Sequence, residues 1–255
     1  MPDETDHDPS EFHSGGLVKP FLDHLEDLRW TLIKCVIALG AAVSLCLFFV
    51  RELLQVLYQP LIWAKICDSP QDFLVAIEVV SPWSVAFKVG IYGGLLLSIP
   101  LMLYFVGQFI LPALTKKERG YLWPAFAAGG VMFLAGVAFC YFVLMPQTLA
   151  ITWQFGTYLG WKMQWTVQSY VSFVVRFSIA MGLGFELPVL ILILVRLGVL
   201  SSATLRRFRR HVIVINVIAA AAITPGSDLL SLALVAGPMC LLYEACIWIA
   251  WLMRR

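Results

Sequence analysis

The chain has 255 residues, of which 60% are hydrophobic and only 13% are charged, and its mean hydropathy is +0.85. This composition excludes an ordinary soluble domain and is typical of a polytopic helical membrane protein. The net charge of only +2 gives no indication of a nucleic-acid partner.

The N-terminal segment is acidic. Residues 1–27 hold eight of the sixteen acidic residues, the reverse of the basic start of a signal peptide. We predict an acidic, disordered cytoplasmic tail over residues 1–20 and a membrane domain over residues 21–255. The segment KPFLDHLEDLRW has apolar residues at helical spacing, which predicts an amphipathic stretch lying on the membrane surface.

Six apolar stretches follow, and they predict an all-α fold with six transmembrane helices. They are Thr31–Val50, Val85–Leu111, Pro124–Pro146, Ser172–Gly198, Val212–Ile223 and Leu229–Trp251. The first four are long enough to cross a hydrocarbon core of about 30 Å. The fifth has only 12 residues. It would cover about 18 Å, so it has to pack among other helices or thin the bilayer.

The distribution of lysine and arginine between the loops predicts how the chain is oriented in the membrane. With six spans both termini lie on one side, and eleven basic residues fall on that side against three in the opposite loops. The eleven are Lys19, Arg29, Lys116, Lys117, Arg119, Arg206, Arg207, Arg209, Arg210, Arg254 and Arg255, and the three are Arg51, Lys65 and Lys162. The positive-inside rule therefore predicts that both termini are cytoplasmic.

Two of the predicted external loops are long. The loop Arg51–Ser84 contains LLQVLYQPLIWAKI, which is apolar enough to lie against the membrane or to cap the bundle. The loop Gln147–Tyr170 is rich in Trp and Tyr, as expected of an aromatic belt at the membrane interface.

No pattern in the chain indicates catalysis or metal binding. The six cysteines are isolated and behave as small hydrophobes, and the four histidines have no metal-ligand spacing. Neither G-x-S-x-G nor H-E-x-x-H is present, so the usual signals of an intramembrane hydrolase are missing. We expect no catalytic residue, no metal and no cofactor.

Glu186 is the only carboxylate deep inside a long apolar span. An ionised group at that depth is costly, so the side chain either faces water or a partner, or stays protonated. Pro188 cannot donate a hydrogen bond to the carbonyl of Gly184, which leaves a second polar group at the same level. Glu186 is either hydrogen-bonded to a neighbouring helix as a packing residue or part of a functional intramembrane site, and we favour the second interpretation.

Few acidic residues are expected on the cytoplasmic side of the membrane domain. Glu26 and Asp27 precede the first span, and Glu118 lies in the loop PALTKKERGYLW. Each could form a solvated ion pair of little energy with neighbouring Lys or Arg. Two acidic sites that converge on one face could instead bind a cationic peptide through strong carboxylate–guanidinium contacts.

The chain resembles the TatC family, whose members are the multispanning receptor subunits of the twin-arginine protein translocase. The resemblance runs from Phe21 to Glu244. Its stretches are FLDHLEDLRWTLI, VVSPWSVAFKVG, YFVGQFILPALTKKER, YVSFVVRFSIAMGLGFELPVL and ITPGSDLLSLALVAGPMCLLYE, in that order. The order of these five stretches, together with the six predicted spans, is highly specific for this family.

The resemblance implies a curved, cup-like bundle of six helices with short fifth and sixth helices, in the bacterial cytoplasmic membrane. It implies a non-enzymatic receptor that binds twin-arginine signal peptides and nucleates a translocase for folded proteins, driven by the protonmotive force. The implied partners are signal peptides, single-span TatA- and TatB-type subunits, the lipid bilayer and further copies of the chain within a hetero-oligomeric complex.

The resemblance also implies the signal-peptide site, at the N-terminal segment and the loop between helices two and three. Glu118 corresponds to the family's loop glutamate, and Phe109 to the phenylalanine before that loop. Asp27 stands where the family commonly has Glu in a His-Leu-x-Glu-Leu-Arg motif, which keeps the carboxylate with a shorter reach. Glu26 beside it could compensate, and Arg29 corresponds to the arginine of the motif.

The resemblance also implies positions within the membrane and in the external loops. Glu186 corresponds to the polar position of helix four, where partner helices dock. The family often has Gln after the Tyr of helix two, where this chain has Tyr104-Phe105. Gln108 lies one turn further on, and we expect it to serve the same face, as a second intramembrane polar position for partner docking. Pro60 corresponds to the proline of the first external loop, and Asp228 to the acidic residue of the last loop.

The alternative function is a proton-coupled small-molecule transporter that uses Glu186 as its proton site. Many such transporters carry inverted repeats. This chain has no visible inverted repeat and no second carboxylate at mid-membrane depth, and both points argue against that alternative.

Overall fold

The structure is a computed structural model that describes residues 18–110, 116–223 and 229–252. The predicted tail, apart from its last three residues, and Asp228 lie outside this part of the chain. The described part is helical apart from short connections and one isolated β-bridge between Val75 and Thr166. Its elements are α1 (Val18–Phe48), α2 (Val50–Trp63), α3 (Pro70–Phe73), α4 (Ser81–Ile110), α5 (Lys116–Phe139), the π-helical segment η2 (Cys140–Leu144), α6 (Met145–Tyr158), α7 (Val167–Arg196), α8 (Ser202–Ile223) and α9 (Leu229–Leu252).

Within the described residues, five segments are long and apolar enough to cross a membrane. They are His24–Phe48, Ser81–Ile110, Trp123–Tyr158, Val167–Arg196 and Leu232–Leu252. The predicted fifth span, Val212–Ile223, is the C-terminal part of α8, which is not among the five. Four arginines occupy the N-terminal half of α8, and they lower its hydropathy.

The prediction that the N-terminal amphipathic stretch forms a separate element on the membrane surface is wrong. α1 begins at Val18 and continues without interruption to Phe48. Neither glycine nor proline occurs between Pro20 and Gly40, so nothing in the sequence interrupts the helical hydrogen bonds. The acidic residues of the stretch therefore lie on the first turns of the first spanning helix.

The third span is longer than expected. It passes from α5 through the π-helical segment into α6, which ends only at Tyr158. Pro146 does not terminate the helix: it lies where the π-helical segment passes into α6, at a change in the pattern of backbone hydrogen bonds. The predicted loop Gln147–Tyr170 is therefore helical in its first half.

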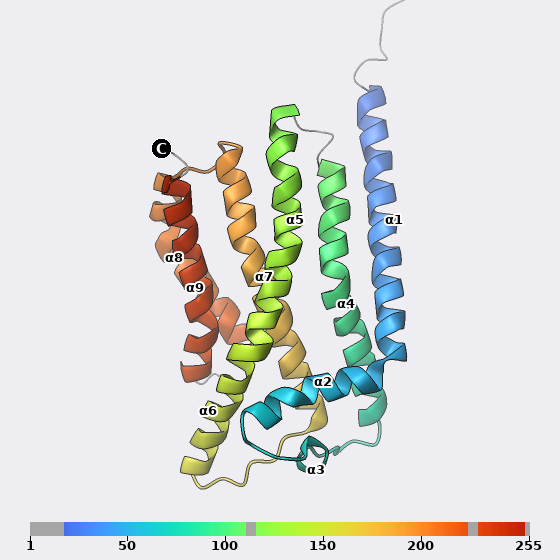
Figure 1. The fold of residues 1–255 in the computed structure, drawn as a ribbon, viewed down its shortest axis with the longest axis vertical. Coiled ribbons are helices and arrows are strands. Elements are labelled where there is room, and N and C mark those ends of the chain that lie inside the picture. The colour runs from blue at the N-terminus through green and yellow to red at the C-terminus, as the bar shows by residue number, and fades with distance from the viewer. Residues whose placement is uncertain (1–17, 111–115, 224–228, 253–255) are drawn as a thin grey trace, which may run out of the picture.

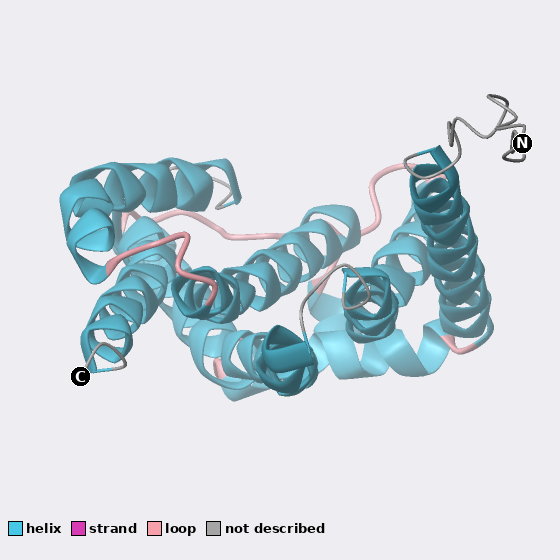
Figure 2. Cartoon of the chain, turned by 90° about the horizontal axis from the view of Figure 1, so that it is seen from above, coloured by secondary structure: helices cyan, strands magenta, loops and turns pink. Residues whose placement is uncertain are grey.

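The long helices form a row rather than a closed bundle (Figures 1 and 2). α4 packs against α1 on one side and against α5 and α7 on the other, and α9 packs between α7 and α8. The approach of α1 to α4 requires small residues on α4. A Cβ added to Gly94 would lie 2.7 Å from the backbone of Val43, and one added to Gly90 would meet the side chain of Leu47.

The two ends of the molecule differ. The beginning of α1 and the end of α9 lie at the same end, and α2 and α3 lie at the other (Figure 1). α2 crosses this second end and buries Leu61 completely against the main core, which also includes Val89, Met145 and Val174. The apolar stretch of the loop that we predict to be external thus caps the bundle, one of the two arrangements that its composition predicts.

Candidate functional site

The acidic residues of the N-terminal stretch lie on the exposed surface of α1. Glu26, Asp27 and Arg29 all have exposed side chains. The Thr31 hydroxyl donates a hydrogen bond of 2.8 Å to the backbone carbonyl of Asp27. The side chains of Glu26 and Asp27 are exposed, so a cationic ligand can reach their carboxylates.

Phe109 joins α1 to the end of α4. Its ring stacks on the imidazole of His24, with centroids 4.5 Å apart and an interplanar angle of 17°. The contact brings Asp27, one turn beyond His24, close to the end of α4. His24 is part of the motif that carries the resemblance, but no pattern in the sequence pairs it with a residue 85 positions away.

Glu118 lies in the first turn of α5, which begins at Lys116. Its side chain is outside the described part of the structure, as is the linker 111–115 that joins α4 to α5. The backbone nevertheless places the starts of α1 and α5 and the end of α4 at the same end of the molecule (Figure 1). The residues that the resemblance assigns to signal-peptide binding therefore come from elements that meet at one end.

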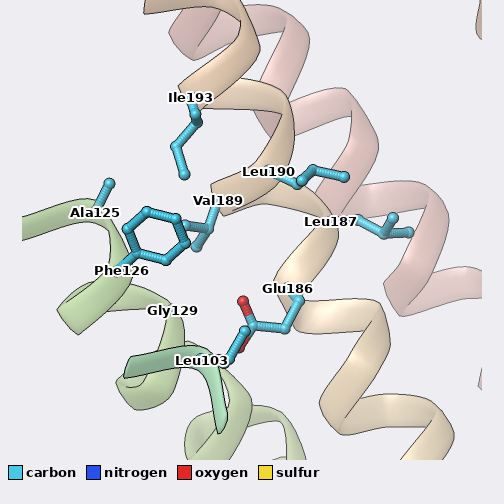
Figure 3. Close-up of a pocket in the computed structure, with 9 residues that line it drawn as sticks. All are labelled: Leu103, Ala125, Phe126, Gly129, Glu186, Leu187, Val189, Leu190 and Ile193. Carbon is cyan, nitrogen blue, oxygen red and sulfur yellow. The ribbon is translucent and has the colours of Figure 1, made fainter. Parts of the chain in front are cut away.

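Glu186 lies on α7 and lines a pocket of about 150 Å³ between α4, α5 and α7 (Figure 3). It is about 28 Å of helix from the start of α7 and about 15 Å from its end. The other lining residues are all apolar or glycine: Leu103, Ala125, Phe126, Gly129, Leu187, Val189, Leu190 and Ile193. Glu186 is the only polar side chain in the pocket.

The carboxyl group of Glu186 points towards α5 and α4 (Figure 3). Its Oε1 atom is buried and has no hydrogen-bond partner in the described structure. A Cβ added to Gly129 would lie 3.0 Å from Oε2, so the missing side chain at Gly129 leaves room for the carboxyl group. A buried oxygen without a partner costs free energy, and a donor from another molecule would remove that cost. This favours the functional interpretation of Glu186.

Gln108 does not line this pocket. Its amide donates a hydrogen bond of 2.8 Å to the hydroxyl of Tyr104 one turn earlier, and Tyr104 in turn packs edge-on against Trp123. Leu103 is the α4 residue that reaches the pocket. The expectation that Gln108 joins Glu186 as an intramembrane polar position therefore has no support from the pocket, because the spacing of residues does not show which face of α4 is turned towards Glu186.

Polar contacts also join α8 to α9, away from the Glu186 pocket and from the acidic residues of α1. Arg209 on α8 forms a 2.5 Å salt bridge with Glu244 on α9, and the Tyr243 hydroxyl donates to the carbonyl of Leu205 at 3.0 Å. Pro60 is buried inside α2 at the opposite end of the molecule. Among the described residues, no group of three His, Cys, Asp or Glu side chains could hold a metal ion.

Comparison with known proteins gives a consistent assignment. A family model described as "Sec-independent protein translocase protein (TatC)" matches residues 23–238. A TatC protein of Akkermansia muciniphila is 36% identical over 210 residues, which are 81% of this chain and 60% of that protein. One of Deinococcus radiodurans is 33% identical over 225 residues, 88% of this chain and 83% of that protein.

A relative from a plastid and a solved structure extend the comparison. The chloroplastic TATC protein of Pisum sativum is 34% identical over 235 residues, 91% of this chain and 64% of its own length. A crystal structure of the twin-arginine translocase receptor TatC superposes with a TM-score of 0.78 at 30% identity, covering 91% of this chain and all of the other. The chain belongs to the TatC family of Sec-independent protein translocase proteins, which are membrane components of a translocase and not enzymes.

Proposed function

We propose that this protein is the receptor subunit of a twin-arginine translocase: it binds twin-arginine signal peptides and nucleates the complex that exports folded proteins, driven by the protonmotive force. The observation that carries the proposal is the stacking of His24 on Phe109, which holds α1, the helix that carries Glu26 and Asp27, against the end of α4. The similar crystal structure, which is that of a twin-arginine translocase receptor, supports it.

Recognition rests on charge and geometry. Asp27, supported by Glu26, and Glu118 supply carboxylates from two elements, and a guanidinium group can bind a carboxylate through two parallel hydrogen bonds. Two adjacent arginines in a peptide require two such partners. Phe109 supplies an apolar surface beside the carboxylates, and Arg29 restricts which charges can approach.

We further propose a cup-like arrangement of six crossings, with α8 as the sixth, and cytoplasmic termini in a bacterial inner membrane. An even number of crossings agrees with the start of α1 and the end of α9 lying at one end of the molecule in Figure 1, whereas five crossings would place them on opposite sides. The 22 residues of α8 extend about 33 Å. Its arginines would lie at the cytoplasmic interface, as the positive-inside rule requires.

The Glu186 pocket is proposed as the docking point for a single-span TatA- or TatB-type partner within the hetero-oligomer. The pocket is open and apolar, with one acceptor whose Oε1 atom lacks a partner. A partner helix with one donor side chain would satisfy that atom at a depth where no water competes. Asp228 and Gln108 remain proposed family positions, for which the described structure supplies no partner contact.

Binding of the peptide is the test of this function. The purified protein, in lipid nanodiscs, is incubated with an immobilised signal peptide that carries paired arginines and with the same peptide carrying paired lysines. Lysine cannot form the bidentate contact, so we expect retention on the arginine peptide and much weaker retention on the lysine peptide. Equal retention on both, or none on either, would contradict the proposal.

Labelling of Cys67 tests the proposed orientation. Cys67 lies in the loop between α2 and α3 and is half-buried. Burial raises the pKa of its thiol, and the nearby charge of Asp68 raises it further. Because the thiolate is the reactive form, labelling of intact cells by an impermeant maleimide should accelerate from pH 7 to pH 8, by roughly tenfold. Cys67→Ser should abolish this signal. Labelling of Ser201→Cys from outside the cell would overturn the orientation.

A further inference from the structure

Pro60 interrupts the hydrogen bonding of α2. It lies inside the helix, three residues before its end, and is buried. In an α-helix the N–H of residue 60 would donate to the carbonyl of Val56, but proline has no N–H and its ring displaces that carbonyl. The carbonyl of Val56 therefore needs a donor from outside α2.

Tyr141 supplies that donor. Its hydroxyl donates a hydrogen bond of 2.6 Å to the backbone carbonyl of Val56, although the two residues are 85 positions apart. Tyr141 lies in the π-helical segment between α5 and α6. Such segments often re-aim side chains at functional positions. The ring of Tyr141 also packs edge-on against Trp63 at the end of α2.

A second tyrosine bonds to the next carbonyl of α2. The hydroxyl of Tyr170, near the start of α7, donates to the carbonyl of Leu57 at 2.7 Å. Tyr170 is buried, and its ring packs against Tyr58. Adjacent carbonyls of one helix thus accept hydrogen bonds from two different spanning segments.

We propose that Pro60 leaves the Val56 carbonyl available as a hydrogen-bond acceptor. Tyr141 and Tyr170 are then positioning residues: through the carbonyls of Val56 and Leu57 they hold α2 across the external end of the bundle. These contacts bind three elements into one unit: α2, the π-helical segment and α7. The same two long segments, α5 with its continuation and α7, frame the Glu186 pocket further along. The two tyrosines therefore fix the spacing of these helices from the external end.

If the proposal is right, the stabilising effect of the Tyr141 hydroxyl depends on the presence of Pro60. Side-chain packing alone would not make one depend on the other. With Pro60→Ala, residue 60 regains an N–H, and the Val56 carbonyl can form its ordinary helical bond. The hydroxyl of Tyr141 then matters less. The bond of Tyr170 to Leu57 should be less affected, because the donor expected for Leu57, the N–H of Leu61, is present in both backgrounds.

A double-mutant cycle measures this dependence as the midpoint of thermal unfolding of the full chain in lipid nanodiscs. Tyr141→Phe keeps the ring and removes only the hydroxyl, so we expect a loss of roughly 1–6 °C in the parent. In the Pro60→Ala background the loss should be at most half as large. Tyr243→Phe is the matched control, because its hydroxyl also donates to a helix carbonyl, that of Leu205, away from α2. Its effect should be equal in both backgrounds.

An equal effect of Tyr141→Phe in both backgrounds would overturn the proposal. Should Pro60→Ala fail to fold, amide hydrogen exchange on Tyr141→Phe alone decides the matter. The proposal requires faster exchange over Val50–Trp63 with α9 unchanged, and unchanged exchange in α2 would refute it. Neither measurement uses a signal peptide, so the outcome is independent of the proposed receptor function.

Discussion

Replacing Glu118 with alanine is expected to weaken the binding of a twin-arginine signal peptide by roughly 1.5–3 kcal/mol, the worth of a hydrogen bond to a charged group. This corresponds to an increase in Kd of about 10- to 150-fold. The reason is that a guanidinium group loses one of its two carboxylate partners and is left with water. Titration of the labelled peptide against protein in nanodiscs measures the change.

Two variants serve as controls for Glu118→Ala. Asp27→Glu should bind the peptide about as well as the parent, because it restores the commoner residue of the motif and keeps the charge. Glu52→Ala removes an exposed glutamate from α2, at the opposite end of the molecule, and should have no effect on Kd. If Glu118→Ala binds as tightly as the parent, the assignment of Glu118 is wrong.

Replacing Glu186 is expected to separate two roles of this residue. Glu186→Gln keeps a donor and an acceptor at nearly the same volume, in a pocket where Gly129 leaves room for the group. Glu186→Ala removes both polar atoms and enlarges an apolar pocket. If a partner helix docks through a hydrogen bond to Glu186, the glutamine variant should retain much of the export. The alanine variant should lose roughly 3- to 30-fold in partner affinity, as expected for an intramembrane hydrogen bond.

Export of a twin-arginine cargo and crosslinking to the partner subunits, at matched protein levels, give the two readouts. A proton carrier would behave differently, because an amide cannot release a proton at working pH. Both variants would then be inactive to the same degree. Equal and complete loss of export would contradict the docking role and revive the transporter alternative.

The sequence by itself predicts five of its six spans as the structure has them. The apolar stretches of α4, α7 and α9 were predicted to within about five residues, because the length of an apolar run is set by the hydrocarbon it has to cross. The lack of catalytic patterns predicts a protein that is not an enzyme, and membership of the TatC family supports this prediction. The sequence also predicts that Glu186 stands alone among apolar residues, and the structure places it inside α7 in a pocket whose other lining residues are apolar or glycine.

Local sequence was misleading where two signals compete. The sequence predicts that the third span ends at Pro146, but the helix continues, because the proline lies where the π-helical segment passes into α6 and the backbone hydrogen-bond pattern changes. The amphipathic pattern of KPFLDHLEDLRW predicts a surface segment, yet the absence of a helix breaker after Pro20 makes it part of α1. Periodicity reports which face is apolar but not where a continuous helix bends or ends.

Only the tertiary structure decided which distant residues meet. The stacking of His24 on Phe109, the opening that Gly129 leaves for Glu186, and the hydrogen bond from Tyr141 to the Val56 carbonyl each join residues more than 50 positions apart. Such contacts depend on the rotation of each helix about its axis and on which helices are neighbours. Packing of whole side-chain surfaces sets both quantities, and the hydropathy of a single segment carries neither.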